Sequence, residues 1–424
     1  PSVGGGEAAR CADAVPEGEP VSVYVHVPFC ETLCWYCGCA TSVPNGYRRV
    51  GEYVRRLKDE IRLWARAVAG AGGIGHLHFG GGSPNALSDA DFASIVTELR
   101  ETFGINPGAE IAVELDPRTM HEGQVEALAA AGVTRASLGV QTLAPRVQEA
   151  VNRLQPPEMI RSLVERLRAA GIRDINMDLM YGLPHQTTND VREAAQFAAS
   201  LGAARVSVFG YAHVPWFAKH QKAIDEAALP DLALRLEQAE AAASAMQDAG
   251  YRTIGLDHYA RGDDSLALAH WEGRLHRNFQ GYTDDPHETL IGIGATSISQ
   301  FREGFIQNLK DRKAWAEAVD AGRLPVERGI AFTPEDRLRA RAIEQLMCQL
   351  TVDVEDACRE AGAAKGSLDD ALARARALEA AGLCEVRGSR IRVPDEARLF
   401  LRTVAQCFDA RTPAAPVQRH AKAV

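Results

Sequence analysis

Four cysteines near the start of the chain have a spacing that suits metal or redox chemistry. Cys30, Cys34, Cys37 and Cys39 all lie in the stretch VHVPFCETLCWYCGCA, and the first three follow C-x3-C-x2-C spacing. Three thiolates on one loop are typical of an iron–sulfur cluster, and three ligands leave one iron open for a substrate or cofactor. Two alternatives remain at this point: a zinc site completed by Cys39, and a redox pair of Cys34 and Cys37.

A run of glycines supplies the second group of candidate residues. The stretch HFGGGSP holds Gly80, Gly81, Gly82 and Ser83. Glycine has no Cβ, so the backbone N–H groups of such a run can approach a ligand closely. The run matches neither the dinucleotide-binding pattern G-x-G-x-x-G nor a Walker loop, and taken alone it indicates only a tight turn.

Alternating β-rich and helical segments predict the scaffold that positions these residues. From residue 21 to about 300 the pattern is that of parallel strands joined by right-handed helical crossovers. Six predicted strands cover residues 21–27, 76–79, 110–115, 135–140, 174–180 and 205–211, and two more β-like runs cover 253–259 and 290–299. We therefore expect an α/β fold, an incomplete (β/α)6 barrel, with functional groups on the loops that follow the strands.

The composition changes after about residue 330. Helices rich in Ala, Arg and Glu are followed by the hairpin-like stretch GLCEVRGSRIRV. This predicts a mostly helical, winged-helix-like domain, which we interpret as a lid or packing domain in preference to a DNA reader. The expected organisation is a disordered or truncated segment at 1–20, a barrel domain at 21–305, a linker at 306–330, a C-terminal helical domain at 331–410 and a flexible tail at 411–424.

Charge and composition argue against several classes of partner. The formal net charge of −9 argues against a broad nucleic-acid surface. No apolar run approaches the roughly 20 residues of a membrane helix, and the opening segment has no apolar signal region. The nine cysteines form one dense cluster with scattered singles, a distribution that favours a reducing compartment. We expect a cytoplasmic protein that binds neither nucleic acid nor membrane.

The cysteine spacing and the glycine run together resemble the radical S-adenosylmethionine (SAM) superfamily. From about residue 21 to 410 the chain is similar to one family within it, the oxygen-independent coproporphyrinogen III oxidases. The resemblance lies in YVHVPFC, WYCGCA, HFGGGSPNAL, VELDPR, SLGVQT, VNRLQ, NMDLMYGLP, FGYAHVP, GLDHYARGDD and LHRNFQGYT. It implies oxidative decarboxylation of two propionates of coproporphyrinogen III to vinyls, giving protoporphyrinogen IX for haem biosynthesis, by a 5′-deoxyadenosyl radical from SAM.

The resemblance also implies a set of cofactor sites. A [4Fe-4S] cluster would be held by Cys30, Cys34 and Cys37, while Cys39 matches a family cysteine that is not a ligand. The first of two SAM molecules would be bound by Tyr24, Gly81, Glu114 and Ile298. The second would be bound by Tyr36, Gly82, Ser83, Gln141, Arg153, Asp178 and Ala212. The family usually has Phe and Thr where Tyr36 and Ser83 stand, and both replacements keep the chemical character.

The same resemblance sets expectations for partners. They are coproporphyrinogen III and an electron donor such as flavodoxin or ferredoxin, with the chain itself a monomer. Two alternatives are a haem chaperone, which tends to carry CDF where this chain has CGC, and a haem-opening radical methyltransferase. The family also carries a Tyr- and Pro-rich N-terminal segment over the active site, and nothing similar precedes Val21.

Four cationic side chains could serve a substrate that carries carboxylates. They lie in motifs expected to face the cleft: His258, Arg261, His276 and Arg277. The planar fork of arginine suits carboxylate groups. Ordinary surface charge is the equally weighted alternative for all four.

Overall fold

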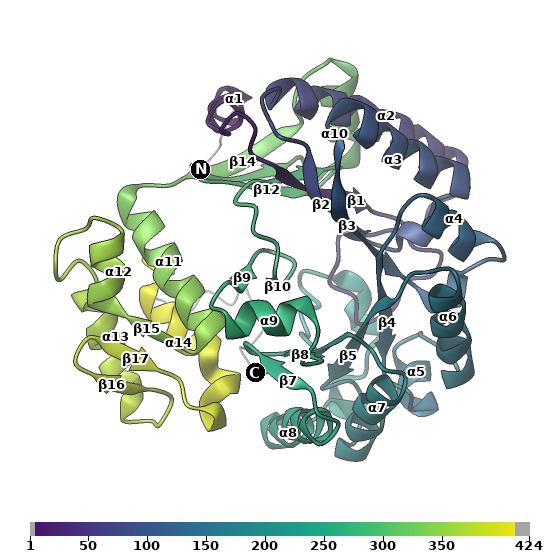
Figure 1. The fold of residues 1–424 in the computed structure, drawn as a ribbon. Helices are drawn as coiled ribbons and strands as arrows, with labels where there is room; N and C mark the ends of the chain where they lie inside the picture. Colours follow the sequence, from purple (N-terminus) through teal and green to yellow (C-terminus); the bar gives the residue numbers. More distant parts are fainter. Residues whose placement is uncertain (1–4, 412–424) are drawn as a thin grey trace. The chain divides into compact units, whose positions relative to one another are not determined.

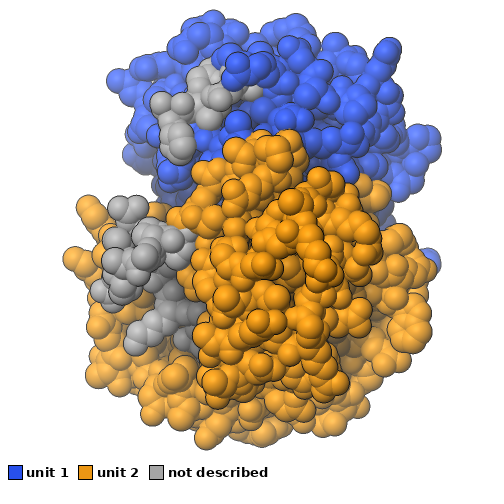
Figure 2. Space-filling model, turned by 90° about the vertical axis from the view of Figure 1, so that its left-hand side faces the viewer, with its two compact units in different colours: residues 1–178, 287–331 blue, residues 179–286, 332–424 orange. Residues whose placement is uncertain are grey.

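The protein is described here by a computed structural model that covers residues 5–411. Contacts divide the chain into two compact units, one of residues 1–178 and 287–331 and the other of residues 179–286 and 332–424 (Figure 2). Each unit is built from segments that are far apart in the sequence. Within residues 5–411, no helix is both long enough and apolar enough to cross a membrane.

Parallel strands form the centre of the first unit. Its strands follow the order β14, β13, β12, β11, β1, β2, β3, β4. Their bounds are β1 (Val21–Val27), β2 (Ile74–Gly81), β3 (Ile105–Leu115), β4 (Arg135–Gln141), β11 (Leu290–Ile293), β12 (Ile298–Phe301), β13 (Gly304–Asn308) and β14 (Val326–Ala331). Strands β11, β1, β2, β3 and β4 pair in parallel, whereas β12, β13 and β14 extend the sheet antiparallel. β5 (Asp174–Tyr181) begins in this unit and ends in the second.

The first unit contains seven α-helices among the described residues, and all but α1 come after β1 in the chain. They are α1 (Gly5–Asp13), α2 (Arg48–Ala67), α3 (Asp89–Thr102), α4 (Gln124–Ala130), α5 (Pro145–Ala150), α6 (Pro157–Ala169) and α10 (Arg312–Asp320). Helix α2 lies beside α3 and α10 (Figure 1). Its apolar side chains at spacings of three and four, including Leu57, Ile61 and Trp64, are fully buried. This amphipathic stripe fixes α2 against the sheet.

The second unit combines helices with the last three strands at one end of the large sheet, which pair antiparallel. β6 (Arg205–Gly210) pairs with β8 (His258–Ala260), and β8 pairs with β7 (Arg252–Ile254). The short strands β9 (His276–Arg277) and β10 (Tyr282–Thr283) form a separate hairpin. The accompanying helices are α7 (Thr188–Ser200), α8 (Leu232–Asp248) and α9 (Ser265–Trp271).

The C-terminal part of the second unit is mostly helical. It contains α11 (Pro334–Gln349), β15 (Thr351–Asp353), α12 (Val354–Glu360), α13 (Asp369–Glu379), β16 (Glu385–Arg387), β17 (Arg390–Arg392) and α14 (Leu401–Ala405). The three strands form an antiparallel sheet in the order β15, β17, β16. Leu346, Ile391 and Phe408 share one buried core with Leu256 and Tyr282, so this part packs against the β9–β10 hairpin.

The structure confirms the α/β fold, with parallel strands in the first unit and a mostly helical C-terminal part that carries the predicted hairpin. All six predicted strands are present, and several are longer than predicted. Each of the two further β-like runs is split into two strands, because Gly255 (φ +55°), Gly294 (φ +102°) and Thr296 (φ +70°) turn the backbone. Left-handed φ values of this kind end a strand.

Two expected irregular segments contain regular structure. Helix α1 lies within the segment expected to be disordered or truncated. The expected linker, residues 306–330, contains the end of β13, all of α10 and most of β14, and Trp315 in α10 is almost fully buried. The expected flexible tail lies, apart from Arg411, outside the described residues. The proposed domain boundaries stay a prediction.

Candidate active site

The cysteine loop follows β1 and is closed by backbone hydrogen bonds at its base. The N–H of Cys30 donates to the carbonyl of Ser42 at 3.1 Å, and Ser42 donates back to Pro28 at 3.1 Å. Midway along the loop, the Asn152 side chain donates to the carbonyl of Leu33 at 2.8 Å. The protein's own hydrogen bonds therefore hold the loop at both its ends and in its middle.

Two of the three candidate ligands receive hydrogen bonds from neighbours on the loop or on the strand end. The Cys30 sulfur lies 3.1 Å from the Thr41 hydroxyl and 3.6 Å from the Ser83 hydroxyl. Burial raises the pKa of Cys30, and these two hydroxyls oppose that effect. The Cys37 sulfur accepts from the Cys39 N–H at 3.4 Å. A hydrogen bond with the Cys39 side chain, against the effect of burial, lowers the pKa of Cys37 to about 7.

The third candidate ligand faces two arginines. Arg118 Nη2 lies 3.3 Å, and Arg153 Nη1 3.4 Å, from the Cys34 sulfur. Both guanidinium groups also bind Asp116, at 2.6 Å for Arg118 and 3.3 Å for Arg153. Burial would raise the pKa of Asp116, but the two arginines outweigh it and hold that pKa below its ordinary value. Cationic donors at a sulfur stabilise the thiolate that binds metal.

This donor set fits an iron–sulfur cluster. Donors lie within hydrogen-bond range of all three sulfurs, and such donors are a standard means of tuning a cluster. Among residues 5–411, no group of three or more His, Cys, Asp and Glu side chains is arranged to hold one metal ion. The fit therefore rests on the spacing of the thiols and on the donors around them.

The glycine run packs against the first strand and the cysteine loop. An added Cβ at Gly82 would lie 2.5 Å from the carbonyl oxygen of Phe29 and 2.8 Å from that of Val27. The N–H of Gly82 donates to Val27 at 2.8 Å, and that of Ser83 donates to Phe29 at 2.7 Å. We expected N–H groups of this run to face a ligand, but these two are already bonded within the protein. The absent side chain of Gly82 therefore serves close backbone packing.

Glu114 ends β3 beside the glycine run. Its carboxylate accepts from the N–H of Gly81 at 3.3 Å and lies 3.0 Å from His78 Nε2. A Cβ at Gly80 would lie 2.5 Å from a carboxylate oxygen of Glu114. The side chain is about two-fifths exposed, so its remaining acceptor sites can meet a ligand.

Tyr24 lies within the same group of side chains. Its hydroxyl is 3.1 Å from His26 Nδ1, and its ring is stacked on that of His78. Burial raises the pKa of Tyr24 and lowers the pKa of His26, so both side chains are held neutral. Tyr24, Gly81 and Glu114, three of the residues expected at the first SAM site, thus lie on adjacent strands. The fourth, Ile298, begins β12.

Two residues expected at the second SAM site, Gln141 and Arg153, lie together at the end of β4. A Cβ at Gly139 would lie 2.9 Å from Arg153 and 3.0 Å from the Gln141 side chain. Arg153 is buried, and among the described residues its Nε has no partner. Gln141 has a left-handed φ of +64°. Its backbone therefore turns where the strand ends.

The other members of that set lie at different places. Asp178 accepts from the Ser137 hydroxyl at 3.1 Å. Tyr36 lies between two candidate cysteine ligands, and burial raises its pKa well above the ordinary value. Ala212 belongs to the second unit, directly after β6, where its carbonyl accepts from Gln221 at 3.2 Å.

Sequence reasoning missed Asp116 and Arg118 as site residues. Both lie in the VELDPR stretch, directly after β3. Their position after a parallel strand, beside Glu114, was an available signal.

Family comparisons agree with this geometry. The radical SAM superfamily model matches residues 24–198, and the HemN C-terminal domain model matches residues 332–400. The chain is 43% identical to the oxygen-independent coproporphyrinogen III oxidase of Bradyrhizobium diazoefficiens over 100% of this chain and 94% of that protein. It is 38% identical to the enzyme of that name from Salmonella typhimurium over 92% of this chain and 86% of that protein.

A solved structure shows the same fold over nearly the whole chain. It is the coproporphyrinogen III oxidase HemN of Escherichia coli, a radical SAM enzyme. The two structures agree with a TM-score of 0.92 and 36% identity, over 97% of this chain and 94% of that chain. The haem-chaperone alternative gains no support from these relatives. Radical SAM membership implies a [4Fe-4S] cluster and SAM, which settles the choice among cluster, zinc and redox pair. The chain belongs to the oxygen-independent coproporphyrinogen III oxidase family of the radical SAM superfamily.

Proposed function

We propose that this protein oxidatively decarboxylates two propionates of coproporphyrinogen III to vinyl groups, giving protoporphyrinogen IX in haem biosynthesis. One observation carries the proposal. The thiols of Cys30, Cys34 and Cys37 each have a hydrogen-bond donor nearby, and the glycine run at the end of β2 lies beside them, with Ser83 in contact with Cys30. Full-length similarity to proteins that bear the oxidase name supports the same substrate.

The cofactor sites would use these groups as follows. Cys30, Cys34 and Cys37 would hold the [4Fe-4S] cluster, and two SAM molecules would occupy the two sets of residues named above. When bound, the reduced cluster and SAM supply a 5′-deoxyadenosyl radical able to take hydrogen from the propionate β-carbon. Glu114 would accept hydrogen bonds from the ammonium or ribose hydroxyls of the first SAM. His78, bonded to the same carboxylate, fixes its orientation.

The proposal includes an electron donor, an oligomeric state and a cellular compartment. A flavodoxin or ferredoxin supplies electrons, the protein acts as a monomer, and it works in the cytoplasm. Residues 21–305 form the barrel domain, and residues 331–410 form the C-terminal helical domain. The two family matches, which begin at residues 24 and 332, support this order.

An anaerobic assay tests the function. The protein is reconstituted with iron and sulfide, reduced, and supplied with SAM and coproporphyrinogen III, and protoporphyrin is followed by fluorescence after oxidation. Product that depends on SAM and is absent from Cys34→Ala supports the oxidase. A cluster that cleaves SAM without vinyl product contradicts it and favours a haem-handling role.

A further inference from the structure

The four cationic side chains that could bind a carboxylated substrate have different surroundings in the structure. Arg261 is exposed and forms two 2.9 Å hydrogen bonds with Asp263. His276 is exposed and lies 3.1 Å from Glu344. These two have ordinary surface partners and need no ligand. The other two, His258 and Arg277, have different surroundings.

Arg277 is held in place but is incompletely paired. It lies on β9, opposite Tyr282 of β10, and its guanidinium lies over the Tyr282 ring, 4.5 Å from the centroid. Its Nη1 is buried and has no hydrogen-bond partner among the described residues. A buried, unpaired donor on a charged group is costly, so such an atom is expected to meet a ligand or water.

Asp257, a carboxylate near Arg277, is shared by several side chains. Asp257 lies 2.8 Å from His258 Nδ1 and accepts from Arg402 at 3.4 Å. Burial would raise the pKa of Asp257, but His258, Arg277 and Arg402 outweigh it and lower that pKa below its ordinary value. Asp257 therefore interacts with Arg277, Arg402 and His258 at once. A carboxylate ligand would give Arg277 a partner that it does not share.

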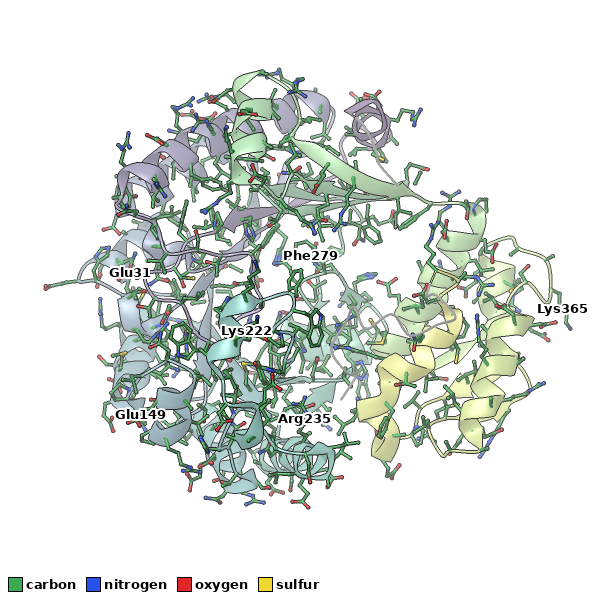
Figure 3. The ribbon with its side chains drawn as sticks, turned by 180° about the vertical axis from the view of Figure 1, so that it is seen from behind. Glu31, Glu149, Lys222, Arg235, Phe279 and Lys365 are labelled. Carbon is green, nitrogen blue, oxygen red and sulfur yellow. The ribbon has the colours of Figure 1, made fainter. Side chains whose placement is uncertain are left out.

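Aromatic rings enclose the same group. The His258 ring meets the Tyr282 ring edge-on at 5.2 Å and the Phe209 ring edge-on at 5.7 Å. The hairpin tip closes over the imidazole, because a Cβ at Gly281 would lie 3.2 Å from His258 Nε2. Phe279, at the same tip, is 44% exposed and is labelled in Figure 3. Apolar rings beside a cationic fork suit a pyrrole that carries a carboxylate arm better than they suit free acetate or phosphate.

We propose that Arg277, oriented by Tyr282 and backed by the Asp257–His258 pair, binds a propionate carboxylate of the porphyrinogen substrate. The site belongs to the second unit, whereas the cluster ligands belong to the first. The identification of the ligand rests on the proposed function. A carboxylate is also present on SAM, so the test must distinguish these two sources.

Binding measurements on the reconstituted full-length protein test the site. The probes are coproporphyrin III, the stable oxidised form of the substrate, and its tetramethyl ester, which lacks the charged carboxylates; binding is followed by porphyrin fluorescence. We expect Arg277→Gln to weaken coproporphyrin III binding about tenfold or more and to leave ester binding unchanged, since a hydrogen bond to a charged group is lost. Arg277→Lys keeps the positive charge but lacks the planar guanidinium fork, so its affinity for coproporphyrin III should lie between those of wild type and Arg277→Gln.

A neighbouring arginine supplies the matched control. Arg274 is exposed, pairs with Glu272, and should tolerate Arg274→Gln with unchanged binding of both porphyrins. Circular dichroism melting of each variant reports folding.

Three results would overturn the inference. They are unchanged coproporphyrin III binding by Arg277→Gln, an equal loss for acid and ester, and a loss of SAM affinity by calorimetry with porphyrin binding intact. Failure of the proposed function is distinguishable, because wild type would then form no vinyl product from coproporphyrinogen III.

Discussion

Arg118 donates Nη2 to the Cys34 sulfur at 3.3 Å while Asp116 holds the same guanidinium at 2.6 Å. The Cys34 sulfur and the Asp116 carboxylate therefore share the guanidinium groups of Arg118 and Arg153. Hydrogen bonds and net charge near the sulfurs set the reduction potential of a cluster. Positive charge favours the reduced form, which carries the extra electron.

Removing the Arg118 charge should make the cluster harder to reduce. We expect Arg118→Gln to decrease the ratio of reduced to oxidised cluster at a fixed potential by roughly threefold to tenfold, the latter equal to about 59 mV for one electron. Asp116→Asn should shift the potential the other way. An anaerobic titration followed by electron paramagnetic resonance gives both midpoints, with iron content as a check on cluster loading.

Exposed Arg55 is the matched control for this titration, because it pairs with Asp59 and Asp320 on α2 and α10. Arg55→Gln should keep the wild-type midpoint. Equal midpoints for Arg118→Gln and wild type would show that Arg118 only anchors the loop.

Gly82→Ala should disrupt the cysteine loop. The new Cβ would lie 2.5 Å from the Phe29 carbonyl oxygen, a backbone atom that has no free rotation to relieve the contact. We expect reduced iron incorporation and weaker SAM binding, measured by iron analysis and calorimetry. Gly38→Ala is the control, since nothing lies within 4 Å of its added Cβ although it sits between Cys37 and Cys39. Similar losses in both variants would contradict this packing argument.

Local patterns predicted the strands and the cysteine loop because these depend on residues close together in the chain. β1 is a single buried run from Val21 to Val27, and Cys30 follows it directly. Cys34 and Arg118 are 84 residues apart in the chain, so no local sequence pattern could predict their contact. The sequence predicts a linker where the antiparallel strand β14 forms, because a short strand with mixed exposure lacks a strong alternating pattern.

A buried carboxylate on α2 predicts a pH dependence of stability. Glu60 accepts from the Gly294 N–H at 2.9 Å, Trp315 Nε1 at 2.8 Å and Asn308 Nδ2 at 2.6 Å. Burial, only partly opposed by these bonds, raises its pKa from 4.5 to about 7. Between these values the folded state keeps a proton that the unfolded chain has released, so stability falls as pH rises through this window.

The size of the effect is on the order of 3 kcal/mol across the full window. It appears as the difference in unfolding free energy between wild type and Glu60→Gln, from urea unfolding at several pH values. Glu52→Gln, at an exposed position of the same helix, should keep the wild-type slope. If the unfolding free energy of Glu60→Gln depends on pH as steeply as that of wild type, other groups cause the pH dependence.

Asp264 should be the most sensitive carboxylate of the second unit to truncation. It accepts from Arg205 Nε at 2.7 Å and caps α9 by accepting from the Leu266 N–H at 2.8 Å. Both Asp264 and Arg205 are buried, so Asp264→Ala leaves a guanidinium with an unpaired Nε as well as an uncapped helix. Breaking such a pair costs about 3–5 kcal/mol, and loss of the cap adds to this cost. Thermal unfolding measures this loss of stability. The control is Asp263→Ala at the adjacent, exposed position, which should keep the unfolding midpoint near that of wild type. Equal shifts of the midpoint in the two variants would refute the buried-pair explanation.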